Sequence, residues 1–174
     1  MKEDMSLTNA AGDRDSFAEA LEAAHRLNRA LGPLRIDREG TKDRLRSALR
    51  QPEQEVQALL LLETLGTEAT KALIDDLLGQ ALRVRYTLLI RNLLGRLAWS
   101  EAKEIVPPAV WRLLEIEDEA DDFRRMAELL DHLGLREALQ ELCARAGESL
   151  DEEVREVAED FGEERLEACR NGSC

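Results

Sequence analysis

The sequence predicts an all-α protein, built as a right-handed α-solenoid of about five helix pairs. Three observations support this expectation: a composition that disfavours strands, a repeated helix ending, and helix start signals at matching places. Of the 174 residues, 44% are apolar but only 3% are aromatic, and four prolines are too few for many short, turn-linked strands. Stacked helices are therefore the expected architecture.

A common ending marks the repeat. Five segments carry apolar residues at helical spacing and finish with a large apolar residue directly before a glycine. A helix often ends at a left-handed residue, and glycine adopts that conformation without a steric penalty. The glycines lie 34, 29, 39 and 28 residues apart, a period that suits stacked helix pairs. They are Gly32, Gly66, Gly95, Gly134 and Gly162.

Each of these glycines is expected to end the first helix of a pair. Capping boxes that start at Ser16 and Ser149 mark the beginnings of two first helices, and Pro52 suits the first position of another. The first helices are expected over residues 17–31, 52–65, 84–94, 122–133 and 152–161.

A second helix is expected after each glycine. Thr41, Thr67 and Ser100 are candidate N-caps, and Pro107-Pro108 is expected either to kink the third of these helices or to restart it. The second helices are expected over residues 41–50, 68–82, 101–115, 136–146 and 163–170.

The segment 56–65 is apolar over most of its circumference, so we expect it to be interior. On that expectation, Leu60→Ala costs about 2–5 kcal/mol. Likewise, Gly95→Val is expected to destabilise the chain by placing a β-branched residue in a left-handed cap.

The segment 151–162, DEEVREVAEDFG, has an Asp before Val-Arg, small apolar residues after it, and a helix-ending glycine. Val84-Arg85 with Leu94-Gly95 follows the same pattern, whereas Phe123-Arg124 replaces Val-Arg and the unit over 52–66 lacks the Arg. The pattern resembles the HEAT-repeat family over residues 16–170. This resemblance implies a curved array whose second helices line the concave side and bind a partner, usually a protein. Tetratricopeptide repeats share the period, but their first-helix Trp, Leu-Gly and Tyr pattern is absent.

Charge is distributed unevenly along the chain. Residues 1–100 carry 15 basic and 15 acidic side chains, whereas residues 101–174 carry 9 and 22, so the whole net charge of −13 lies in the second part. An acidic surface attracts cationic protein surfaces and repels nucleic acid and anionic membranes. We therefore expect a protein partner with a basic surface, and no nucleic-acid or membrane partner.

Candidate partner-binding residues lie on the second helices and in the acidic loop after residue 115. The third unit is irregular, because its 39-residue step is ten longer than the one before it, and it holds both tryptophans. Insertions in repeats often mark the binding side. Trp111 is also a core candidate. The candidates are Lys71, Asp75, Trp99, Lys103, Glu104, Trp111, Arg112, Glu115, Glu117, Asp118, Glu119, Asp121 and Asp122.

The chain lacks the common signatures of catalysis. It has no P-loop, no dinucleotide-binding glycine pattern, no metalloprotease helix and no calcium loop, and we expect His25 and His132 to be ordinary helix-surface residues. We therefore expect a non-catalytic adaptor or inhibitor without cofactor or metal. The alternative is a HEAT-like enzyme, such as a chromophore lyase that uses a groove carboxylate; a DNA-glycosylase reading fits the acidic charge poorly.

Three further expectations concern organisation. Residues 1–15 are expected to be disordered, residues 16–170 to form the repeat domain, and residues 171–174 to be a flexible tail. Cys143 is expected to be a buried thiol, while Cys169 and Cys174 receive no role. The absence of an apolar leader or spanning segment predicts a cytoplasmic protein, and the oligomeric state is left open.

Overall fold

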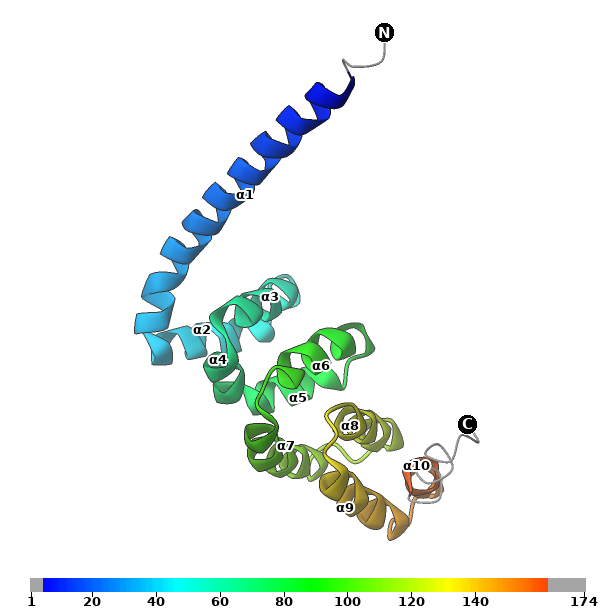
Figure 1. Cartoon of the computed structure of the whole chain (residues 1–174). Helices are drawn as coiled ribbons and strands as arrows, with labels where there is room; N and C mark the ends of the chain where they lie inside the picture. The colour runs from blue at the N-terminus through cyan, green and yellow to red at the C-terminus, as the bar shows by residue number, and fades with distance from the viewer. Residues whose placement is uncertain (1–4, 163–174) are drawn as a thin grey trace. The chain divides into compact units, whose positions relative to one another are not determined.

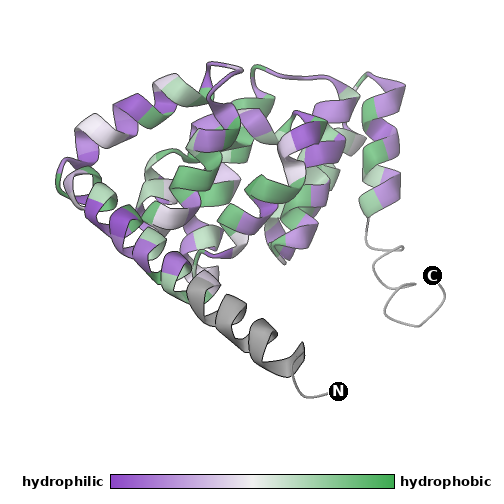
Figure 2. Cartoon of the chain, turned by 90° about the horizontal axis from the view of Figure 1, so that it is seen from above, coloured by the Kyte–Doolittle hydropathy of each residue, from purple (hydrophilic) through white to green (hydrophobic). Residues whose placement is uncertain are grey.

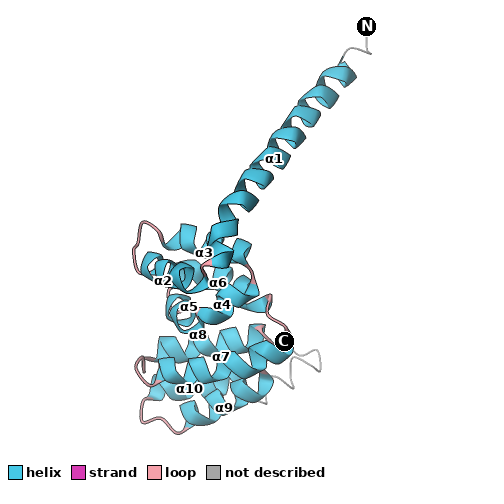
Figure 3. Ribbon diagram, turned by 90° about the vertical axis from the view of Figure 1, so that its left-hand side faces the viewer, coloured by secondary structure: helices cyan, strands magenta, loops and turns pink. Residues whose placement is uncertain are grey.

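A computed structural model describes the backbone of residues 5–162 and the side chains of residues 16–162. Every regular element in this part of the chain is a helix, so the all-α prediction is confirmed (Figure 3). The chain divides into two units, one ending at Arg44 and one beginning at Leu45, and each is described by itself. The proposed domain bounds stay a prediction. The expected helix over 163–170, the tail, Cys169 and Cys174 lie outside the described residues.

The first unit consists of helix α1, Met5–Ile36, and the start of α2, Arg38–Leu49. Helix α1 continues through Gly32, so the expected ending there is wrong. Ser16 lies inside α1 instead of at its start. Helix α2 begins before Thr41 because the carboxylate of Asp37 accepts the Gly40 amide at 3.1 Å. The hydroxyl of Thr41 instead donates to the Leu34 carbonyl at 2.9 Å.

The second unit places its helices in two rows (Figure 1). One row contains α3, α6, α8 and α10, and the other contains α4, α5, α7 and α9. Helix α5 packs against α6 and α7, while α8 packs against α9 and α10. Their bounds are α3 Glu55–Leu65, α4 Thr67–Ala72, α5 Ile74–Ala81, α6 Thr87–Gly95, α7 Trp99–Leu114, α8 Ala120–His132, α9 Arg136–Gly147 and α10 Glu152–Phe161, with a 3₁₀ turn η1 over Val84–Tyr86.

Apolar side chains from every helix of the second unit meet in one continuous core, and hydrophobic residues gather where these helices lie side by side (Figure 2). Only one face of α3 belongs to this core. Leu59 and Leu62 are fully buried, but Leu60 is 49% exposed. The expectation that the whole helix is interior is wrong, and the large cost assigned to Leu60→Ala loses its structural basis. Val56 and Leu60, one turn apart, lie on the exposed side of α3.

Several expected helix ends shift by a few residues. Residues 51–54 form a turn, so Pro52 is not the first residue of α3. The expected helix over 68–82 is interrupted at Leu73 and becomes α4 and α5. The helices expected over 122–133, 136–146 and 152–161 match α8, α9 and α10 to within two residues.

Two of the expected cap glycines have the left-handed backbone that the prediction requires. Gly66 has φ 95° and Gly134 has φ 67°. Gly162 has φ −66°, and Gly95 is the last residue of helix α6. A Cβ on Gly95 would meet nothing within 4 Å. The reason given for Gly95→Val destabilising the chain is therefore wrong.

Candidate protein-binding surface

Helix α7 forms one wall of the candidate site. Its buried face consists of Ala102, Val106, Ala109 and Val110, which pack into the core. The helix runs without a break through Pro107-Pro108, so neither a restart nor an end occurs there. It begins at Trp99, one residue before the expected N-cap, Ser100.

Helix α9 forms the other wall and runs parallel to α7. The ammonium of Lys103 lies 2.8 Å from the carboxylate of Glu137, and the guanidinium of Arg145 lies 4.3 Å from the centre of the Trp111 ring. Both pairs join residues 34 positions apart, so the register is the same at each end. We refer to the exposed side of these two helices, with the loops that follow them, as the α7–α9 surface.

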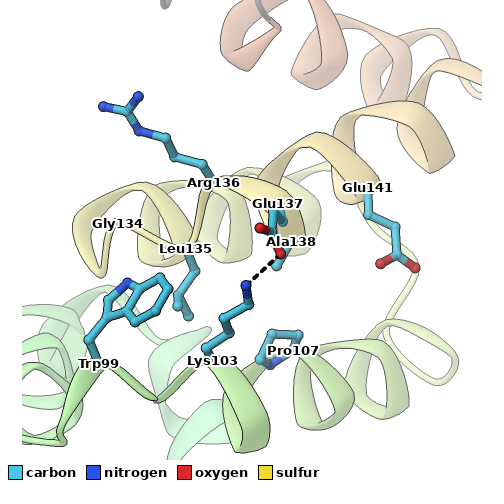
Figure 4. Close-up of a pocket in the computed structure, with 9 residues that line it drawn as sticks. All are labelled: Trp99, Lys103, Pro107, Gly134, Leu135, Arg136, Glu137, Ala138 and Glu141. Carbon is cyan, nitrogen blue, oxygen red and sulfur yellow. Dashed lines mark ion pairs between the residues drawn. The ribbon is translucent and has the colours of Figure 1, made fainter. Parts of the chain in front are cut away.

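A hollow of about 400 Å³ lies at the N-terminal end of this surface. Trp99 stands at one end of it, and Lys103 reaches across it toward Glu137 (Figure 4). The Trp99 side chain is 61% exposed, and the Lys103 ammonium lies 5.3 Å from its ring centre. Pro107 and Leu135 add apolar surface to the walls. Tryptophan side chains are enriched among the residues that contribute most to protein–protein binding, so we take Trp99 as a candidate anchor.

A second hollow, of about 500 Å³, lies at the C-terminal end. The loop after α7 contributes Asp118 and Glu119 to it, and the loop after α9 contributes Glu148 and Leu150. Leu150 is fully exposed, and Ile116 in the first loop is 78% exposed. This hollow therefore combines carboxylates with the uncovered side chain of Leu150, and Ile116 is exposed in the loop that contributes Asp118 and Glu119.

The carboxylates of the loop after α7 and of the first turn of α8 crowd one another. Partial burial of Asp122, together with repulsion from Glu117 and Glu119, raises the pKa of its carboxyl group. Arg125 opposes this effect but does not cancel it. Among the described residues, Glu117, Asp118 and Glu119 pair with no cation, so this loop contributes negative potential to the surface.

The prolines of α7 add unused hydrogen-bond acceptors to the wall. In a helix, the amide of residue i+4 donates to the carbonyl of residue i, and proline has no amide hydrogen. Pro107 and Pro108 therefore leave the carbonyl oxygens of Lys103 and Glu104 without their usual helical donor. Lys103 and Pro107 both line the first hollow.

Several of the sequence-predicted site residues are engaged within the chain. Lys71 lies 2.8 Å from Glu101, and Arg112 lies 2.6 Å from Asp75. The hydrogen bond from Lys71 lowers the pKa of the Glu101 carboxyl. These pairs bridge α4 or α5 to α7, so they hold successive helices together instead of offering free charges.

The same bridging occurs in the other row of helices. Arg91 on α6 lies 2.6 Å from Glu128 on α8, and Arg124 on α8 pairs with Asp160 on α10. Four of the ion pairs in the two rows join residues that are 30, 36 or 37 positions apart, within the range of the glycine spacings in the sequence. We refer to these ion pairs between successive helices as the ladder. It was not predicted from the sequence, although opposite charges recur there at these separations.

The remaining predicted residues differ in their surroundings. Glu104, Glu115, Glu117, Asp118 and Glu119 are exposed and pair with no cation among the described residues. Asp121 pairs weakly with Arg125 at 3.7 Å. Trp111 is half-buried, so it belongs partly to the core and partly to the surface.

A buried carboxylate that the sequence analysis missed lies elsewhere, at the start of α3. Glu55 is 2% exposed and accepts hydrogen bonds from Arg83 at 2.6 Å, Arg85 at 3.3 Å and the Tyr86 hydroxyl at 2.6 Å. Both oxygens of this carboxylate accept hydrogen bonds from the segment 83–86, so Glu55 joins α3 to the η1–α6 segment.

Other candidate chemistry is sparse in residues 16–162. No group of three or more His, Cys, Asp or Glu side chains there is placed to hold a metal ion. Cys143 is half-buried, and this burial raises the pKa of its thiol. Across the described helices, none has the length and apolar character that a membrane span requires. His25 and His132 are both exposed.

Comparisons with protein-family models, with curated proteins and with solved structures found no match to this chain.

Proposed function

We propose that this protein is a HEAT-like repeat protein that acts as a non-catalytic adaptor or inhibitor. In this proposal the second unit is a right-handed α-solenoid, in which α3 pairs with α4–α5, α6 with α7, and α8 with α9, while α10 starts another pair. The parallel register of α7 and α9 and the ladder of ion pairs one repeat apart support this arrangement. The fifth pair, at the N-terminus, stays a prediction.

The partner is a protein with a basic surface, which docks on the α7–α9 surface. One observation carries this proposal: cations of the second unit are consumed by internal contacts, while carboxylates of the two loops are not. Among the described residues from 45 onward, Arg136 is the one lysine or arginine with no partner in that range. Asp118 and Glu148 are among the carboxylates that no described cation compensates, and a cationic surface gains by meeting them.

Affinity purification from the source organism's extract tests this proposal. The test variant is Glu117→Gln/Asp118→Asn/Glu119→Gln, and the matched control neutralises three exposed acids elsewhere, Glu53→Gln/Asp131→Asn/Glu159→Gln. A true partner is retained by the wild type and the control, is released by the test variant, and dissociates as salt increases. Retention of every captured protein by the test variant would contradict the proposal.

A further inference from the structure

We infer that the segment bound by the α7–α9 surface is an extended, basic stretch of chain with two separated anchors: an apolar side chain at the Trp99 hollow and Lys or Arg side chains at the acidic hollow. This inference rests on the proposed function and specifies its ligand. Three independent features of the surface support this inference.

The first feature is the separation of two unlike hollows. Trp99, Pro107 and Leu135 give one hollow an apolar character, whereas Asp118, Glu119 and Glu148 give the other a negative charge. Trp99 begins the 16-residue helix α7, and Asp118 and Glu119 lie in the loop after it. At 1.5 Å per residue, the indole and this acidic loop lie about 24 Å apart. One compact side chain cannot reach both, so a single ligand must contact them with different residues.

The second feature is a group of hydrogen-bond acceptors on α7. The carboxylate of Glu104 has no described cation, and the carbonyl oxygens of Lys103 and Glu104 lack helical donors because of the two prolines. A ligand that satisfies these oxygens must bring donors. An extended backbone has free amide groups, whereas a helical ligand has already used most of its own. The acceptors therefore favour an extended ligand over a helix.

The third feature is the pair of uncovered aliphatic side chains beside the carboxylates. Ile116 and Leu150 come from separate loops, and both are exposed at the acidic end. Long Lys and Arg side chains match this combination, because their methylene stems cover apolar surface while their charged ends reach carboxylates. An acidic ligand would meet repulsion here, and a purely apolar one would leave the carboxylates without counter-charges.

The length of the ligand follows from the geometry. An extended chain advances about 3.3 Å per residue, so about seven residues span the distance of about 24 Å. The probe is therefore a nine-residue, C-terminally amidated peptide with fluorescein at its N-terminus. It has Leu at the first position, Lys-Arg-Lys at the last three, and alternating Ser and Gly between them. The control peptide has the same composition, but its Leu is moved next to the basic residues.

Fluorescence anisotropy with the full chain at 50 and 150 mM salt measures both peptides. We expect the probe to bind about tenfold more tightly than the control, which corresponds to about 1.4 kcal/mol. Trp99→Ala should remove this difference and leave binding of the control peptide unchanged. The triple loop variant Glu117→Gln/Asp118→Asn/Glu119→Gln should weaken both peptides and flatten their salt dependence, whereas Glu53→Gln/Asp131→Asn/Glu159→Gln should change neither.

A further variant separates ligand binding from folding. Pro107→Ala restores an amide hydrogen inside α7, so it should raise the melting temperature while lowering probe affinity severalfold. Equal affinity of probe and control, or no loss on Pro107→Ala, overturns the two-anchor segment. A cellular partner released by the loop variant but unaffected by Trp99→Ala would uphold the proposed function and still overturn this inference.

Discussion

Leu59 and Leu60 are neighbours on α3 with opposite surroundings, and their alanine variants should differ sharply in stability. Leu59 is completely buried, whereas Leu60 is 49% exposed. Leu59→Ala removes about three buried carbons, worth about 2.4 kcal/mol of transfer free energy, and the cavity raises the total to about 2–5 kcal/mol. Leu60→Ala loses about half of the transfer free energy and leaves no closed cavity, so it should cost about 1 kcal/mol.

Thermal unfolding followed by circular dichroism at 222 nm measures the difference. For a chain of this size, 1 kcal/mol corresponds to about 2–4 °C, so Leu59→Ala should lower the melting temperature by about 6–15 °C and Leu60→Ala by about 3 °C. Urea midpoints should rank the variants in the same order. Equal losses would show that α3 is covered on both faces, and a larger loss at Leu60 would show that the helix is rotated from the orientation described.

Three more predictions follow from particular residues. Glu55→Ala should lower the free energy of unfolding by about 1.5–3 kcal/mol, because the carboxylate accepts hydrogen bonds from two arginines and a tyrosine hydroxyl. The exposed control Glu53→Ala should change the free energy of unfolding by no more than about 0.5 kcal/mol, and urea unfolding compares the two variants. Gly66→Ala should cost about 1–3 kcal/mol because of its φ of 95°, while Gly95→Ala should be neutral or stabilising, and reversal of this order in thermal melts would contradict the cap assignment. Asp122→Asn should raise the melting temperature at pH 7. The pKa of Asp122 is raised in the folded state, so its ionised form opposes folding above that pKa. The difference between variant and wild type should vanish below the usual carboxyl pKa, and thermal melts from pH 3 to pH 7 measure it.

The helical class and most second-unit helices could be predicted because apolar spacing and glycine position act locally. Helix α10 covers the expected residues, but its N-cap is Asp151, whose carboxylate accepts the Glu153 amide at 2.9 Å, so the capping box predicted to start at Ser149 is wrong. The errors occur where a local signal competes with a stronger neighbour. Thr41 was expected to cap α2, but Asp37 lies earlier and has a better-placed carboxylate. Gly95 remains helical because nothing at that position requires a left-handed residue.

The candidate site was only partly predictable for a different reason. A sequence identifies which residues carry charge, but whether a charged side chain is free to bind a partner depends on its contacts with the neighbouring helices. Lys71, Asp75 and Arg112 resemble free binding residues in the sequence, and each is engaged by a side chain on a neighbouring helix. Trp99, in contrast, is an exposed candidate, because it is the first residue of α7 and its side chain is outside the core.

Internal pairing also explains why the acidic excess becomes a local feature. Most bridges between successive helices use one cation and one carboxylate, while Glu55 and Asp76 each pair with two arginines, so the ladder removes at least as many cations as carboxylates from the available surface charge. The second part of the chain has far more acids than bases, and its surplus therefore remains after the ladder is complete. That surplus includes the loops after α7 and α9, where Asp118 and Glu148 have no described cation. A stacked structure that neutralised these loops would need cations there, and Arg145 is the one that lines the hollow, already placed over Trp111 and paired with Glu141 at 2.6 Å. The contacts that join the helices thus leave part of the negative charge uncompensated at one end of the α7–α9 surface.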